Sequence, residues 1–345
     1  MNAPFYGLGH VAKLVVGNGR LGVHALPASI TFAAIFYTLV AFAVSTRLVA
    51  RLDLPAPGLA AGAAVLGSPI WYYASLSSSY THATDAGAFA LAAYAAYRAT
   101  MSPGRRWSLA LGTALGLEVA VRPFNAGLVL GACVALAALR RFQAALVTGA
   151  AACVSFGLLV LVPISLGTGL LTRADGTHVG SSADFGFAPL TPIRMLFTEH
   201  RGLYVWTPLT FLSTVGFILL LRRPGRSRPF LAVLGSMALG LLLMHVSLVW
   251  WDGGWSFSMR YLASLVPLYA LGIAGLVDAL RPVWRPWIVV LASACVAWSL
   301  YLGLSHAFGA NQQAGAFGVA TTHTPREWLH LLWSYSRVRH LTDRL

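Results

Sequence analysis

The amino-acid sequence predicts an all-α protein, a polytopic bundle of about ten membrane-spanning helices with outer loops and a short outer C-terminal tail. Of its 345 residues, 57% are hydrophobic and only 10% are charged, whereas a soluble domain has about 25% charged residues. The apolar residues are grouped in runs close to the length of about 20 residues that a spanning helix needs. Arginines occupy every second connection between these runs, a pattern typical of a multi-pass membrane protein.

Ten apolar runs are expected to form the spanning helices. They are residues 28–46, 58–76, 83–97, 107–121, 124–139, 144–166, 204–221, 229–249, 260–280 and 287–305. The third and fourth runs carry Asp85 and Glu118, so at those depths they are expected to face protein or water instead of lipid. Residues 1–27 are expected to form an outer loop or a surface helix, and with the ten runs they make one domain, residues 1–305. Residues 306–345 then form the outer tail.

The connections between the runs alternate in character, and one set is short and basic. Its arginines are Arg47, Arg51, Arg98, Arg105, Arg106, Arg140, Arg141, Arg222, Arg223, Arg226, Arg228, Arg281 and Arg285. With ten spans, all of them lie on the same side, which the positive-inside rule makes cytoplasmic. Both termini and the other connections, residues 77–82, 167–203 and 250–259, are then expected on the outer side.

The sequence argues against several classes of function. The net charge is +14, but arginines at helix ends set topology and contact anionic headgroups, so no nucleic-acid partner is expected. Cys133, Cys153 and Cys295 all fall inside apolar runs and are expected to be small buried residues, not a disulfide or a metal set. There is no Walker loop and no Cys-x-x-Cys or His-Glu-x-x-His motif, so ATP-driven and metalloprotease mechanisms have no support.

The segment Trp250–Tyr261 is the most distinctive connection between two apolar runs. It contains three tryptophans, two glycines, Asp252 and Arg260. Indole side chains such as Trp251 favour the depth of the lipid headgroups, and charge at the mouth of a membrane helix needs a partner or a use. A guanidinium can hold a phosphate through two parallel hydrogen bonds. We interpret the segment as one wall of a site at the membrane surface, with a simple ion pair between Asp252 and Arg260 as the alternative.

Two further polar pairs lie near the outer ends of expected helices. His82 and Asp85, at positions i and i+3, share a helical face, and are expected either to bind a sugar hydroxyl or phosphate or to cap the helix. Glu118 and Arg122, at i and i+4, are expected to form an intrahelical ion pair that neutralises both charges. The alternative is that Arg122 faces a lipid phosphate and that Glu118 orients it.

The end of the largest internal outer loop holds a third polar set. Glu199, His200 and Arg201 place an acid, an imidazole and a guanidinium directly above the seventh expected helix. Tyr204 and Trp206 follow at the depth where aromatic residues anchor a protein in the interface. Anchoring and substrate binding are both compatible with this segment.

Several of these segments, taken in order, resemble one family of membrane enzymes. They are Tyr80–His82, Arg122–Pro123, Arg201–Tyr204, Trp206–Pro208 and Gly253–Leu262, with Pro267 beyond. Over nearly its whole length the chain resembles bacterial integral-membrane glycosyltransferases of the GT-C class, which are related to protein mannosyltransferases and lipid A aminoarabinose transferases. The resemblance rests on the order of these segments along the chain and on the side of the membrane where each is expected.

The resemblance implies a function and a location. The protein would move a sugar from a polyprenyl-phosphate donor to a glycan, lipid or protein acceptor, with inversion at the anomeric carbon by direct displacement. Transfer would take place on the extracytoplasmic face of the bacterial inner, or plasma, membrane. No cofactor is assigned, and a requirement for a divalent metal ion is left open.

The chain departs from this family at its start. In the family, a first helix leads into an outer loop whose acidic residue serves as base or binds metal. Residues 1–27 contain no Asp or Glu, so the chain is expected to be truncated, to be inactive, or to use a substitute. The candidates for that catalytic role are Asp85, Asp175, Asp184 and Asp252, since deprotonation of an acceptor hydroxyl needs a base within hydrogen-bond reach.

The residues expected to bind the lipid phosphate or the substrate share an outer position. They are Arg260, Arg122, Arg201, His82, His200, Trp251 and Tyr204. No set of metal ligands is predicted. Two other functions stay open: a transporter or flippase of lipid-linked saccharides, and a non-catalytic assembly partner. Broken helices near mid-membrane would favour the transporter.

Overall fold

The computed structural model describes residues 3–16, 20–78, 81–161, 185–186, 188–252, 256–308 and 316. In chain order its α-helices are α1 (Ala3–Val16), α2 (Arg20–Arg51), α3 (Pro57–Leu66), α4 (Ile70–Ser75), α5 (His82–Met101), α6 (Arg105–Val121), α7 (Ala126–Ala138), α8 (Phe142–Phe156), α10 (Thr191–Phe197), α11 (Leu203–Trp206), α12 (Leu209–Arg222), α13 (Arg228–Val246), α14 (Val266–Ala279) and α15 (Arg285–Phe308). Shorter helical turns are η1 (Pro123–Asn125), η2 (Gly157–Leu161), η4 (Arg260–Leu262) and η5 (Pro282–Trp284).

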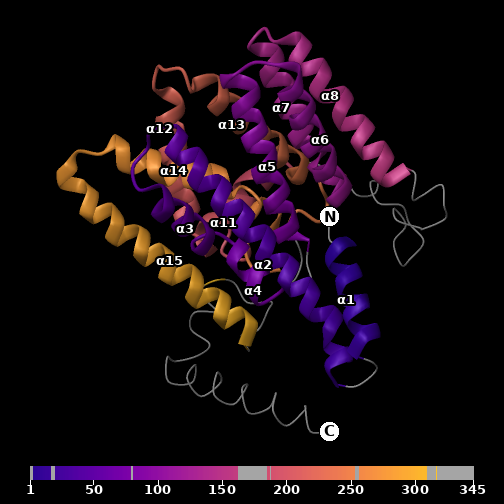
Figure 1. The fold of residues 1–345 in the computed structure, drawn as a ribbon. Helices are drawn as coiled ribbons and strands as arrows, with labels where there is room; N and C mark the ends of the chain where they lie inside the picture. Colours follow the sequence, from indigo (N-terminus) through magenta and orange to yellow (C-terminus); the bar gives the residue numbers. More distant parts are fainter. Residues whose placement is uncertain are drawn as a thin grey trace.

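The all-α prediction is confirmed. Within the described residues the sole pairing of β type is an isolated bridge between Phe185 and Leu248. The helices gather into one bundle, with α8 and α15 on opposite flanks and α5 between them (Figure 1). The bundle places the α5, α6 and α13 ends that carry His82, Glu118 and His245 within one region.

Helix occupies each of the ten expected spans. By length and composition, four described helices can cross a membrane: Pro27–Arg51, Phe142–Val160, Arg228–Val246 and Pro282–Ala307. Shorter apolar helices are Pro57–Leu66, Pro123–Ala138, Leu209–Arg222 and Val266–Ala279. The remaining two, α5 and α6, carry Asp85 and Glu118, and both carboxyl groups are fully buried, as expected for helices that face protein at those depths. The chain is a multi-pass helical membrane protein.

Some helix boundaries differ from the expected ones. Helix α2 begins at Arg20, well before residue 28, and α1 precedes it. Helix α14 begins at Val266 instead of residue 260, because Pro267 suits the first turn of a helix and residues Arg260–Leu262 form a separate 3-10 turn. Arg260 therefore belongs to this turn and not to helix α14. The expected tail, residues 306–345, lies outside the described residues except for 306–308 and 316.

Two expected spans are broken, and their breaks touch. The second divides into α3 and α4 around Gly67–Pro69, and the seventh divides into α11 and α12 at Thr207–Pro208. A Cβ atom added at Gly67 would lie 2.3 Å from a methyl carbon of Leu209, the first residue of α12. Helix α15 supplies a donor at the break between α11 and α12, where Trp298 Nε1 donates to Val205 O at 2.9 Å. Ser299 of α15 lies beside the other break, with its Oγ 3.5 Å from Gly67 O and 3.0 Å from Cys295 O of its own helix.

Small residues bring the central helices into backbone contact, as is common in membrane bundles. A Cβ atom on Gly127 of α7 would stand 2.1 Å from the carbonyl oxygen of Gly240 in α13. At Gly216 of α12 it would stand 2.0 Å from the carbonyl oxygen of Gly272 in α14. The α7–α13 contact matters most for the site, because it places the turn before α7 next to the end of α13.

Candidate functional site

Three buried polar side chains from three successive elements meet at one end of the bundle. Asp85 of α5, Glu118 of α6 and Asn125 of η1 are each 0% exposed. Asn125 Nδ2 donates to Asp85 Oδ1 at 2.5 Å and to Glu118 Oε2 at 2.8 Å. Pro123 directs the chain into the 3-10 turn that presents Asn125, whose backbone N–H donates to Arg122 O at 2.8 Å. One amide thus holds two carboxyl groups together.

Arg122 completes this group by reaching across to α5. Its NH1 lies 2.9 Å from His82 Nδ1, to which it donates, and 3.5 Å from Asp85 Oδ2. The expected intrahelical pair between Glu118 and Arg122 is wrong: within residues 81–161, all of which are described, the ion pair of Arg122 is with Asp85. Helix α6 ends at Val121 and Arg122 has extended backbone angles (φ −149°, ψ 108°), so its side chain leaves the helical face that Glu118 occupies.

The shared face of His82 and Asp85, predicted from their spacing, therefore has a common partner. Both side chains contact Arg122. Capping does not account for Asp85, since its carboxyl group bonds to Asn125 and pairs with Arg122 while the N-cap Thr81 makes no side-chain cap.

A second guanidinium packs on the same tyrosine ring as Arg122. The Cζ atoms of Arg122 and Arg260 are 5.1 and 5.2 Å from the centre of the Tyr261 ring. His245 packs against the same ring, with 4.5 Å between ring centres. Arg122 and Arg260 are both close enough to His82 and to His245 for their charges to interact. An anion bound in this region would therefore be attracted by both arginines.

His245 is held in one tautomer by its own helix. Its Nδ1–H donates to Leu241 O at 2.9 Å, so Nε2 is an acceptor. Within the described residues this buried Nε2 has no hydrogen-bond partner. A ligand that carries an O–H group could satisfy it.

A third arginine, Arg201, is buried among aromatic side chains. Arg201 is only 2% exposed, its Cζ is 5.4 Å from the centre of the Trp206 ring, and its NH1 donates to His200 O at 3.1 Å. Burial lowers the pKa of the Arg201 guanidinium below its usual value, and Tyr73 and Asp252 act in the opposite direction. Asp252 thus lies within electrostatic range of Arg201, a neighbour that the sequence did not suggest.

Tyr73 connects the two groups of residues. Its ring is 4.4 Å from the ring of His82, its hydroxyl donates to Phe257 O at 2.9 Å, and it interacts with Arg201. Phe257, in the segment whose importance the sequence predicted, stacks on Tyr72 with 4.7 Å between ring centres. The site therefore has a charged part around Arg122 and Arg260 and an aromatic wall that leads to Arg201.

Other predicted site residues lie elsewhere or outside the described part of the chain. Tyr204 donates to Thr214 Oγ1 at 3.1 Å and lines an apolar cavity of about 570 Å³ between α12, α13 and α14. His200 is exposed, and Trp251 is half-buried against the core. The structure does not describe Asp175 and Asp184. It also does not describe Tyr80 and Gly253–Trp255, which contributed to the resemblance.

The sequence did not single out several residues that the structure brings into the site. They are Tyr73, Asn125 and His245, whereas Tyr261 belongs to the predicted segment Trp250–Tyr261. Asn125 is a carboxamide that closely follows Arg122–Pro123 near the start of a long apolar run, a signal that could have marked it. His245 could have been marked as an imidazole in an apolar helix. Among the described residues, no three His, Cys, Asp or Glu side chains form a group that could hold a metal ion.

The comparisons with known proteins found similar structures but no similar sequences. No family model and no curated protein sequence matches the chain. Two similar solved structures are crystal structures of ArnT from Cupriavidus metallidurans, one in the apo state and one bound to undecaprenyl phosphate. Each is 19% identical, with TM-scores of 0.48 and 0.49, and they match 91% and 99% of this chain. The chain spans 56% and 63% of the length of those two structures.

Proposed function

We propose that the protein is a membrane glycosyltransferase of the GT-C type, which moves a sugar from a polyprenyl-phosphate donor to an acceptor. The observation that carries the proposal is the pair of guanidinium groups, Arg122 and Arg260, whose Cζ atoms lie 5.1 and 5.2 Å from the centre of the Tyr261 ring. Arginine is the residue best suited to bidentate phosphate contacts. Undecaprenyl phosphate, the ligand of the second ArnT structure, is a carrier lipid of this class, and we infer the same class here from the arginines of this chain.

Arg122 and Arg260 are held in different surroundings, and we assign them different roles in binding the phosphate. Arg122 is fixed by His82 and Asp85, and Asp85 is fixed in turn by Asn125. A cation held by a buried network keeps its position as the reaction proceeds, and preorganised charge of this kind lowers a barrier most. Arg260 sits on a 3-10 turn at the end of the Trp250–Tyr261 segment and is half-buried, so a phosphate can reach it from outside the bundle.

The proposed reaction is a direct displacement. An oxygen of the acceptor hydroxyl attacks the anomeric carbon, the bond from that carbon to the phosphate oxygen breaks, and the electron pair leaves with the carrier phosphate. The leaving phosphate gains negative charge, which Arg122 and Arg260 stabilise more in the transition state than in the ground state. A base takes the hydroxyl proton.

Of the described carboxyl groups, Asp252 fits the base better than Asp85. Asp85 is fully buried and engaged by Asn125 and Arg122, which makes it a positioning residue. Asp252 is half-buried on the loop above the aromatic wall, within electrostatic range of Arg201. We keep Asp175 and Asp184 as further candidates.

A transporter or flippase is the alternative, and the broken helices bear on it. Transporters use the freed backbone groups of broken helices to hold substrate or ions. Here Trp298 Nε1 of α15 donates to Val205 O at the break between α11 and α12. This carbonyl is thus occupied by a protein donor, which favours the enzyme over the transporter.

The test uses the purified full chain in sealed liposomes that contain a polyprenyl-phosphate sugar with a labelled sugar. We expect transfer of the label to an acceptor, binding of undecaprenyl phosphate in preference to uncharged undecaprenol, and loss of that preference in the R122A/R260A double variant. Equal binding of phosphate and alcohol would overturn the phosphate assignment. Movement of the intact lipid-linked sugar between leaflets without cleavage would instead identify a flippase.

A further inference from the structure

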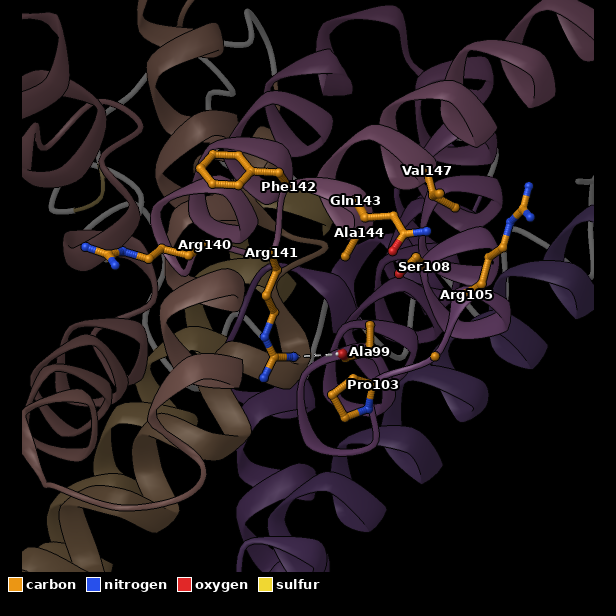
Figure 2. A pocket seen from close by; sticks show the side chains of 11 residues that line it. Ala99, Pro103, Arg105, Ser108, Arg140, Arg141, Phe142, Gln143, Ala144 and Val147 are labelled. Carbon is orange, nitrogen blue, oxygen red and sulfur yellow. Dashed lines mark hydrogen bonds between the residues drawn. The ribbon is translucent and has the colours of Figure 1, made fainter.

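A cavity of about 490 Å³, lined by three arginines among its residues, lies at the opposite end of the bundle, where the α5–α6 and α7–α8 connections meet (Figure 2). It is lined by Ala99 at the end of α5, whereas the arginine site adjoins His82 at the start of the same helix. At 1.5 Å per residue the two positions are about 26 Å apart along the helix. The cavity is therefore separate from the proposed catalytic site.

Two helices begin at this cavity without a capping side chain. Helix α6 starts at Arg105 after Gly104, and α8 starts at Phe142 after Arg141; neither N-cap residue makes a side-chain hydrogen bond to the helix. The first backbone N–H groups of an α-helix have no partner within the helix, and they carry partial positive charge. Residues from both first turns line the cavity, so both helix ends favour an anion there.

A buried hydroxyl on the cavity wall provides an independent indication. Ser108 is 4% exposed and lines the cavity. Its backbone carbonyl accepts a hydrogen bond from Thr148 Oγ1 at 3.3 Å, but its own Oγ makes none within residues 81–161, all of which are described. The Ser108 side chain is thus almost wholly buried, and its hydroxyl has no protein partner among these residues and can donate to a ligand in the cavity.

All charged side chains that line the cavity are positive. Arg141 is fixed beneath the cavity, where its NH1 donates to Ala99 O at 3.0 Å and Thr100 O at 2.9 Å. Arg105 and Arg140 stand at opposite edges with their guanidinium groups turned outward (Figure 2). No Asp or Glu lines the cavity. An anion would therefore meet Arg141, two helix ends and the Ser108 hydroxyl without a repelling carboxylate.

The surroundings indicate where such an anion comes from. Phe142 at the cavity is 63% exposed, and Leu146 one turn further along α8 is 74% exposed. Leu109, next to Ser108, is also exposed. Apolar side chains exposed beside a basic cavity are typical of the boundary between headgroups and acyl chains.

We propose that this cavity binds the anionic phosphate headgroup of a phospholipid, in the leaflet opposite the arginine site. The phosphate oxygens would accept hydrogen bonds from the Ser108 hydroxyl and from the free N–H groups of α6 and α8, with Arg141 beneath them. The acyl chains would lie along Phe142 and Leu146.

The experiment is a lipid titration of the delipidated full chain in detergent, followed by native mass spectrometry. The probes are dioleoyl phosphatidylglycerol, dioleoyl phosphatidylcholine and inorganic phosphate. We expect one phosphatidylglycerol to be held more tightly than phosphatidylcholine. Gln143→Glu, which adds a carboxylate to the cavity lining, should weaken its binding about tenfold, and Ser108→Ala should weaken it by a smaller factor.

Arg285→Gln is the matched control, because it removes the same amount of charge from an exposed position at the start of α15. It should bind phosphatidylglycerol as the wild type does. Thermal unfolding in detergent verifies that each variant is folded. Equal affinity for the two lipids, or Q143E and R285Q behaving alike, would overturn the proposal. Displacement of phosphatidylglycerol by inorganic phosphate would overturn the lipid assignment in favour of a soluble anion.

Discussion

Asn125 is the residue on which the geometry of the proposed site depends. Its single amide nitrogen donates to Asp85 and to Glu118, both fully buried. Without it, two carboxyl groups would face each other inside the bundle, where burial makes repulsion between like charges costly. Because Asp85 also pairs with Arg122, the position of the arginine depends on this amide.

Asn125→Leu should therefore destabilise the protein by about 3 kcal/mol, since it leaves buried polar groups unpaired. Glu118→Gln is the matched control: it keeps an oxygen that can accept from Asn125 Nδ2, and should lower stability by less than about 1 kcal/mol. Thermal unfolding midpoints in detergent compare the two. Similar midpoints for both variants would show that the amide bridge is unimportant.

Arg260→Ala should lower transfer by about 10²- to 10³-fold, the loss typical when one preorganised group at a developing anion is removed. Arg260→Lys should restore only part of the rate, because lysine keeps the charge but loses the planar fork. Folding should survive both changes, since Arg260 is half-buried on a short turn. Turnover per folded molecule is the measurement, with Arg281→Ala, at the other end of the bundle, as the control.

The rival view is that Arg260 only pairs with Asp252 to hold the loop. In that case Asp252→Asn and Arg260→Ala would do similar damage, chiefly as a lower yield of folded protein. Normal turnover by folded R260A would rule out its contact with the carrier phosphate.

At the scale of the elements, close helix crossings fix the arrangement. Helices α12 and α14 meet at Gly216 and Gly272, where a Cβ on Gly216 would overlap a backbone carbonyl oxygen. Backbone atoms cannot rotate away as a side chain can, so the helices would have to separate. Helix α14 follows directly after the turn of Arg260, so a shift of this crossing would move the site.

Gly216→Ala should therefore lower stability by about 2 kcal/mol and reduce transfer, because an overpacked crossing displaces both helices. Gly58→Ala is the control within another helix, α3, where an added Cβ has no atom within 4 Å. It should be neutral or should stabilise by about 0.5 kcal/mol, since alanine favours helix. Thermal unfolding in detergent measures both. A stable, active G216A variant would contradict the crossing.

The elements themselves could be predicted because lipid leaves the backbone few choices. Runs of apolar residues gave the helices, and the buried charges of α5 and α6 followed from the cost of placing them in lipid. The interactions between helices could not be predicted in the same way. The i, i+4 rule favoured Glu118 with Arg122, but the helix ends before Arg122 and turns its side chain towards α5. Asn125 and His245 are single residues in apolar surroundings, with no periodic pattern to mark them.

At the scale of the whole molecule, positive charge is concentrated at one end. The connections α5–α6, α7–α8 and α12–α13 all carry arginines, and the acidic residues described near them are Asp53 and Asp278. Asp278 pairs with Arg223. The opposite end holds Asp85, Glu118, Glu199 and Asp252 beside its arginines. This asymmetry connects the two sites proposed here: a carrier phosphate at the mixed end and a lipid headgroup at the basic end.

The asymmetry also predicts the orientation in the membrane, since arginine-rich short loops stay in the cytoplasm. With ten spans, residue 345 is then on the outer side. A reporter that is active only in the cytoplasm should be silent when fused after Leu345, and active when inserted after Gly225, an exposed residue of the α12–α13 connection. The two fusions control for each other, because silence at both positions would report a failed reporter. Strong activity at Leu345 would mean that the number of spans is odd, and the arginine site would then need to be assigned to a face independently of the C-terminus.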